Sequence, residues 1–184
     1  MTERQYTKAL VKSLDEETRT VEGIGSTDAV DRAGDVVSVG GWELDNFKKN
    51  PVLLFAHDYN QMPVGKVVEI AERNINGKDV LWFKAKIASE KANPFAETVW
   101  HAFKEGIVSA FSVGFQPKEI DGVTQDGGVN ITRQELWEIS VVPVPANPQA
   151  LVMAMSKAAT AALKDAMEEE KPEGDGEGEE PAEP

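Results

Sequence analysis

The sequence from Gly106 to Pro117 reads Gly-Ile-Val-Ser-Ala-Phe-Ser-Val-Gly-Phe-Gln-Pro and predicts a central strand of the fold. The stretch carries no charge and is rich in Val, Ile and Phe, which is typical of a strand in a folded core. Side chains alternate between the two faces of a strand, so Ser109 shares a face with bulky residues and Ser112 shares the other with mostly small ones. The small face leaves room for another molecule, which makes Ser112 the candidate functional serine. The alternative is that the small residues only allow close packing.

The composition narrows the chemistry that the chain can carry. It has 184 residues, of which 41% are hydrophobic, enough for one domain with a core. Cysteine is absent, so a thiolate nucleophile, disulfides and cysteine-ligated zinc are excluded. The two histidines, His57 and His101, are too few for a histidine-rich metal site. We expect neither a metal nor a cofactor.

The net charge of −13 is unevenly distributed along the chain. Residues 168–184 hold nine acids and one lysine, with almost no apolar side chains to offset the entropy of ordering. We therefore expect a folded domain over residues 1–167 and a disordered acidic tail over residues 168–184. The mildly acidic remainder argues against nucleic-acid binding, which depends on basic patches. No apolar run approaches the roughly 20 residues of a membrane span, so we expect no membrane partner.

Short strands separated by turns predict the fold class. Val52–Asp58 and Val129–Val142 are expected strands, and Asn74-Ile-Asn-Gly77 is a hairpin-turn sequence. Helices are expected from Asn93 to about Lys104 and, in an alanine-rich amphipathic stretch, from Gln149 to Met167. The pattern predicts a mainly β protein with α-helices: a closed or nearly closed β-barrel of about six to seven strands surrounded by helices.

A serine, a histidine and a carboxylate suggest one chemistry. If the strand of Ser112 pairs as a hairpin with the last strand, Ser112 and Glu138 can share the face away from the core. A serine becomes a strong nucleophile when an imidazole takes its proton and a carboxylate orients that imidazole. His57, at the end of a hydrophobic strand, is a better candidate than His101, which lies within a helix. Glu135 competes with Glu138 but falls on the Trp137 face. The three residue types follow no spacing rule.

Three motifs resemble those of the prohead, or capsid maturation, serine proteases of tailed phages. They are Leu54-Phe-Ala-His-Asp58, Ala110-Phe-Ser-Val-Gly-Phe115, and Leu136-Trp-Glu-Ile-Ser140 followed by Val142-Pro-Val-Pro-Ala-Asn-Pro148. Asp31-Arg-Ala-Gly-Asp-Val-Val37 and Gly40-Gly-Trp42 also look like the N-terminal part of that family. The resemblance spans about residues 20 to 152, with the motifs in the family's order.

The resemblance implies a role for each candidate residue. It implies His57 as the general base, Ser112 as the nucleophile and Glu138 as the third member. The family is similar in fold to the herpesvirus assembly proteases, which are dimeric β-barrels with a second histidine at the third place. Glu138 is a departure from those enzymes. Analogy to their fold makes the backbone N–H groups around Ala146 and Asn147 candidates for the oxyanion hole.

The expected function is therefore that of a serine endopeptidase. It would cleave scaffold and capsid precursor proteins, and itself, during prohead maturation, as a homodimer inside the assembling prohead in the cytoplasm of the infected host cell. One alternative is a non-catalytic β-barrel that acts as a scaffold or capsid-interaction module. Another is a hydrolase of esters or small amides on the same barrel.

Overall fold

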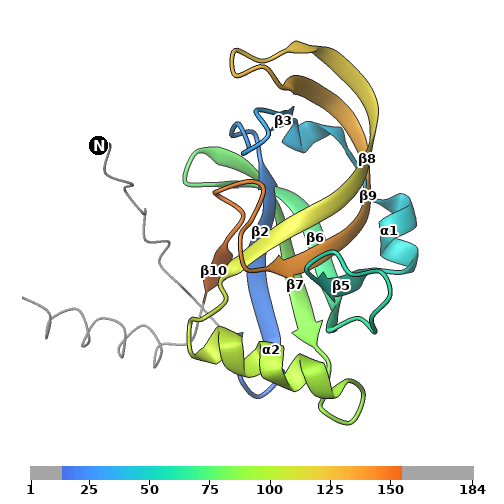
Figure 1. The fold of residues 1–184 in the computed structure, drawn as a ribbon, viewed down its shortest axis with the longest axis vertical. Coiled ribbons are helices and arrows are strands. Elements are labelled where there is room, and N and C mark those ends of the chain that lie inside the picture. The colour runs from blue at the N-terminus through green and yellow to red at the C-terminus, as the bar shows by residue number, and fades with distance from the viewer. Residues whose placement is uncertain (1–13, 155–184) are drawn as a thin grey trace, which may run out of the picture.

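The computed structural model describes residues 14–154 of the chain, and Figure 1 shows their arrangement. The elements in chain order are β1 (Leu14–Asp15), β2 (Thr20–Thr27), β3 (Val36–Val37), the 3₁₀ turn η1 (Val39–Gly41), β4 (Trp42–Glu43), α1 (Asp45–Lys49), β5 (Val52–Phe55), β6 (Gly65–Ile75), β7 (Lys78–Ile87), α2 (Pro94–Lys104), β8 (Ala110–Val123), β9 (Val129–Val142) and β10 (Val152–Ala154). The prediction of a mainly β protein with few helices is confirmed. The domain limits at residues 1 and 167 and the acidic tail lie outside the described residues.

Strand β9 is the centre of the sheet. The hydrogen-bonded path runs β1-β2-β7-β6-β5-β9-β3, and β4 and β8 also pair with β9 while β10 pairs with β2. Strand β8 runs antiparallel to β9 along most of its length, whereas the short strands β3, β4 and β5 run parallel to it. The C-terminal half of β9 is consequently held between β8 and the end of β5.

The expected closed barrel is not confirmed, because the hydrogen-bonded path of the sheet remains open within the described residues. The segment before β10 approaches strands on two sides: Ile24 N–H donates to Leu151 O at 3.0 Å, and Phe111 N–H donates to Ala150 O at 2.9 Å. The sheet has ten strands, more than the sequence predicts, because several two-residue strands leave little periodic signal.

Apolar side chains from the inner face of the sheet and from α2 form the core. Phe111 of β8 contacts Phe83 of β7 edge to face, with ring centroids 4.7 Å apart, and also packs against Phe103 of α2. Asn93 caps α2 by accepting a hydrogen bond from Phe95 N–H, and Pro94 occupies its first turn, as the sequence predicts. Figure 1 shows α2 lying across one end of the sheet, where it supports the start of β8.

Two sequence predictions about local structure are wrong. The central strand begins at Ala110, not near Gly106, and Ile107 is 73% exposed, so neither it nor the exposed Ser109 belongs to a bulky core face. Residues Val152–Ala154 form β10 beside β2, not part of a helix starting at Gln149. Tertiary pairing with β2 overrides the helix propensity there. The remainder of the expected helix lies outside the described residues.

Candidate active site

The register of two strands brings most of the candidate residues together. Strands β8 and β9 form the expected antiparallel hairpin, with Ser112 opposite Ser140 and Gly114 opposite Glu138. Residues directly opposite one another in an antiparallel pair share a face, and so do residues two apart along one strand. Ser112, Gly114, Glu138 and Ser140 therefore form one patch. His57 follows β5, whose Leu54 pairs with Ser140 on the other side of β9.

His57 and Glu138 are in direct contact. His57 Nδ1 lies 2.6 Å from Glu138 Oε1, and since a carboxylate only accepts, the ring donates its Nδ1 proton. The Glu138 side chain is 1% exposed, whereas the His57 side chain is 39% exposed. The imidazole, which carries the second ring nitrogen Nε2, is therefore accessible to solvent. The hydrogen bond to Glu138 raises the pKa of His57, outweighing the lowering caused by partial burial. The carboxylate thus fixes the tautomer and favours the imidazolium.

The turn that presents His57 has an unusual backbone. Ala56 and His57 have φ values of +53° and +58°, in the left-handed region that non-glycine residues rarely adopt. Two hydrogen bonds to β9 hold the turn: Ala56 N–H donates to Val141 O at 2.9 Å, and His57 N–H donates to Ser140 Oγ at 3.0 Å. The position of the imidazole therefore depends on β9 as well as on β5.

Glu138 lies in a more enclosed place than the sequence predicts. It was expected on the face away from the core, yet it is 0% exposed, whereas Trp137, expected on the core face, is 51% exposed. Both faces of β9 are buried only from Glu138 to Val142, and the His57 turn covers the Glu138 face. Burial of a carboxylate is costly without partners. His57 and Ser140 supply them, because Ser140 Oγ donates to Glu138 Oε2 at 2.7 Å.

Sequence reasoning gave no role to three residues in or beside this patch, Ser140, Gly114 and Tyr59. Ser140 links the Glu138 carboxylate to the His57 backbone, and only its position two residues from Glu138 could have indicated this. A Cβ atom on Gly114 would lie 2.2 Å from Glu138 Oε1 and 2.8 Å from the Tyr59 hydroxyl, so only glycine leaves room there. Tyr59 is 62% exposed, but partial desolvation of its hydroxyl and, after it, the Glu138 charge raise its pKa. The Tyr59 hydroxyl therefore stays neutral beside the carboxylate.

The two rival candidates lie in other surroundings. His101 pairs with Glu97 one helical turn away, at 3.2 Å, on the exposed side of α2. Glu135 accepts from Lys118 Nζ at 2.6 Å and from the Asn46 side chain at 2.8 Å. These two hydrogen bonds, Lys118 first, lower the pKa of Glu135. Both groups have partners of their own that are separate from His57 and Ser112.

Ser112 is buried to 6% exposure and its hydroxyl makes no hydrogen bond within residues 14–154. The loop of residues 143–149 borders it: Val142 pairs with Ala110 at the start of the loop, and Ala150 O accepts from Phe111 N–H at its end. Ala146 and Asn147 lie in this loop. The Asn147 side chain donates to Thr27 O at 3.1 Å and accepts from Gln149 N–H at 2.9 Å, which fixes the loop against β2.

The chain matches the caudovirus prohead serine protease family over residues 9–165. It belongs to this family. It is 31% identical over 147 residues to the prohead protease of Escherichia phage T5, covering 76% of this chain and 66% of that protein. It is 32% identical over 152 residues to the capsid polyprotein of Pseudomonas phage PAJU2, covering 82% of this chain and 22% of that protein. The chain thus spans less than two thirds of either relative. No solved structure matches it, so the likeness to herpesvirus assembly proteases stays a prediction.

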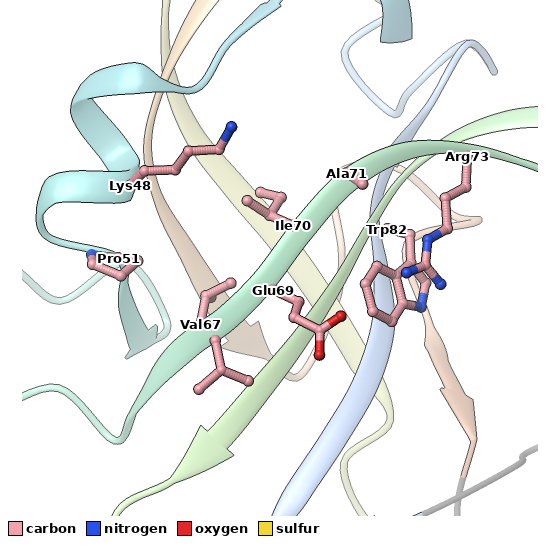
Figure 2. Close-up of a pocket in the computed structure, with 9 residues that line it drawn as sticks. Lys48, Pro51, Val67, Glu69, Ile70, Ala71, Arg73 and Trp82 are labelled. Carbon is pink, nitrogen blue, oxygen red and sulfur yellow. The ribbon is translucent and has the colours of Figure 1, made fainter.

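A surface hollow of about 360 Å³ in this prohead protease family member lies away from the patch of Ser112 and Glu138. Figure 2 shows Lys48 and Pro51 on one side of it and residues of β6 on the other, with the Arg73 guanidinium over the Trp82 ring, 3.3 Å from the ring centroid. None of its lining residues belongs to the patch. No group of three metal-ligating side chains occurs within residues 14–154, and no helix of that part is long and apolar enough to cross a membrane.

Proposed function

We propose that this chain is a serine endopeptidase in which Ser112 is the nucleophile, His57 the general base and Glu138 the residue that orients the base. One observation carries the proposal: His57 Nδ1 contacts the buried Glu138 carboxylate at 2.6 Å, on the strand-pair face that Ser112 shares. The contact uses Nδ1, so Nε2 is the nitrogen available to a serine hydroxyl. Membership of the prohead serine protease family supports peptide hydrolysis over other acyl transfers.

In the proposed mechanism His57 Nε2 takes the proton of Ser112 Oγ as that oxygen attacks the scissile carbonyl carbon. The carbonyl π electrons move to oxygen and form a tetrahedral oxyanion. The oxyanion then collapses, the C–N bond breaks, and His57 gives its proton to the leaving amine. Water hydrolyses the Ser112 ester by the same route, which regenerates the free hydroxyl. Glu138 stabilises the imidazolium in both halves, as the raised pKa of His57 indicates.

The backbone N–H groups of Ala146 and Asn147 are the proposed oxyanion donors. Both residues lie in the loop whose two ends flank the first residues of β8, next to Ser112. Neither amide donates a hydrogen bond to another group in the described part of the chain, so both are free to bind a developing negative charge. Three prolines, Pro143, Pro145 and Pro148, limit the conformations of the loop.

The proposed substrates are scaffold and capsid precursors, cleaved inside the assembling prohead, and the enzyme itself. The relative from phage T5 is named a prohead protease and the relative from phage PAJU2 a capsid polyprotein, which links such sequences to capsid assembly. We also propose a homodimer and a nearly closed barrel of the herpesvirus assembly protease kind. An enzyme that is active only when concentrated would cleave after assembly has begun.

The test compares Ser112→Ala with the matched control Ser109→Ala. Ser109 is exposed and precedes β8, so its replacement should leave activity unchanged. Ser112→Ala should abolish both cleavage of the cognate capsid precursor and labelling by a fluorophosphonate probe, with circular dichroism unchanged. Cleavage by Ser112→Ala at the wild-type rate would end the proposal. A wild-type protein that takes no label would favour a non-catalytic capsid module, and one that takes label but cleaves no precursor would favour an esterase.

A further inference from the structure

The turn of residues 31–35, Asp-Arg-Ala-Gly-Asp, is held by its own hydrogen bonds. Asp31 Oδ1 accepts from Ala33 N–H at 2.8 Å and from Asp35 N–H at 3.0 Å, and Asp31 N–H donates to Asp35 O at 2.8 Å. Gly34 has a φ of +88°, and a Cβ atom there would lie 3.2 Å from backbone atoms of Asp126 and Gly128. The turn therefore has one conformation, and glycine is needed within it.

The turn is also fixed to the far end of the β8–β9 hairpin. Thr124 Oγ1 donates to Gly34 O at 2.6 Å, and Val129 N–H donates to Asp35 Oδ1 at 2.8 Å. Figure 1 shows the tip of this hairpin extending away from α2, with β3 beside it. The hairpin thus holds in place the turn that carries Arg32.

Arg32 contacts two consecutive peptide groups of the loop that borders Ser112. Its backbone N–H donates to Ala146 O at 3.1 Å, and its guanidinium Nη1 donates to Pro145 O. No described peptide bond is cis, so each N–H points opposite to the carbonyl of its own peptide unit. Because both carbonyls face Arg32, the N–H groups of Ala146 and Asn147 both point away from it. Two neighbouring amides that point to one side form an anion-binding arrangement.

We propose that Arg32 is a positioning residue for the oxyanion hole, an inference that rests on the proposed serine-protease function. The guanidinium fixes the Pro145–Ala146 peptide, and its positive charge polarises that peptide so that the Ala146 N–H becomes a stronger donor. Arg32 touches neither substrate nor Ser112. It acts on the transition state through the two amides alone, and so it should affect turnover more than substrate binding.

The test uses Arg32→Met and Arg32→Lys in the full chain, with Arg73→Met as the matched control. The Arg73→Met variant also removes the guanidinium of an exposed arginine, one that is stacked on Trp82 away from the patch. The substrate is a fluorogenic peptide taken from the cleavage site that digestion of the capsid precursor identifies. Arg32→Met should lower kcat about 10- to 100-fold with KM within about threefold of wild type, a smaller loss than removal of an oxyanion donor itself. Arg32→Lys, which keeps the charge, should recover part of kcat.

Two further measurements distinguish a positioning role of Arg32 from a purely structural one. The pH–rate limb of His57 should stay where it is in Arg32→Met, because the His57–Glu138 contact is untouched, and the rate of fluorophosphonate labelling should fall in parallel with kcat. Rates are normalised to folded protein by circular dichroism, so partial unfolding cannot imitate the effect. An unchanged kcat per folded molecule, or a raised KM with kcat intact, would overturn the role of Arg32. An active Ser112→Ala protein would instead overturn the proposed function.

Discussion

The β8–β9 hairpin has two halves that belong to one pair of strands but differ in register and in surroundings. In the half near α2, both faces are covered, and Ser112, Glu138 and Ser140 are all buried. In the far half, β8 is mostly exposed, with Ile120 at 57% and Val123 at 75% exposure. The pairing also differs: its register is regular from Ala110 to Gly114 in the near half and shifts repeatedly beyond Gly114 in the far half. The elements packed over the near half, the His57 turn and α2, make it a site.

Glu138 and Glu135 lie three residues apart on β9, and they too differ in burial and in the partners of their carboxylates. Glu138 is shielded from water and bound to a histidine and a serine, neither of which carries a permanent charge. Glu135 is paired with the permanent cation of Lys118 near solvent. A buried carboxylate beside an imidazole favours the protonated form of the imidazole. A carboxylate beside a lysine at the surface contributes little beyond local stability.

The sharpest test of the comparison is Glu138→Gln, for which we expect the largest effect. The amide keeps an acceptor oxygen but loses the charge that stabilises the imidazolium, so kcat should fall by up to about 10⁴-fold. The pKa of His57 is raised by Glu138, and the base must be neutral to act. Activity in the wild type should therefore rise with pH through a limb above the ordinary histidine value of about 6.5, and this limb should move to lower pH in Glu138→Gln.

A pH–rate profile of both proteins on one peptide checks this expectation, with folding confirmed by circular dichroism. Glu138→His, which imitates the herpesvirus arrangement, should keep measurable activity. A Glu138→Gln enzyme with wild-type turnover would show that the contact between His57 and Glu138 only stabilises the fold.

Ser140→Ala should have the next largest effect, because it removes two contacts at once. Glu138 Oε2 loses a donor and His57 N–H loses its acceptor, and groups left unpaired in this way cost about 1–3 kcal/mol of stability. We expect kcat to fall about 10- to 100-fold, because the His57 turn loses one of its two bonds to β9. The carboxylate charge becomes less dispersed, so the His57 limb should move to higher pH, opposite to Glu138→Gln. A limb that does not move would limit Ser140 to a structural role.

Glu135→Gln should have the smallest effect, although it changes the same residue type three positions away. Its depressed pKa means that the ionised form adds stability above the ordinary glutamate pKa, and this is lost as pH falls through the depressed value. The variant should keep wild-type kcat and pH profile, with a small change in melting temperature at neutral pH. Loss of turnover in Glu135→Gln but not in Glu138→Gln would assign the third catalytic role to Glu135.

Local patterns in the sequence predict several elements correctly because their causes are local. The Asn74–Gly77 turn joins β6 and β7, with Asn76 and Gly77 at positive φ, as that turn sequence requires. Alternation along β8 and β9 correctly places Ser112 and Glu138 on one shared face. Alternation does not predict that Glu138 is buried and Trp137 exposed, because a strand pattern does not reveal which loops cover each face.

The sequence by itself determined the mainly β class, the pairing of the two long strands and the three residue types that a serine protease needs. These depend on side-chain periodicity and on turn residues, which act over a few positions. Only the tertiary structure decided that His57 lies within hydrogen-bond distance of Glu138, that Ser140 joins them, and that Arg32 reaches the loop at Pro145 and Ala146. The contacts of His57 with Glu138 and of Arg32 with Pro145 join residues 81 and 113 positions apart, and they form only when the sheet fixes which strands are neighbours.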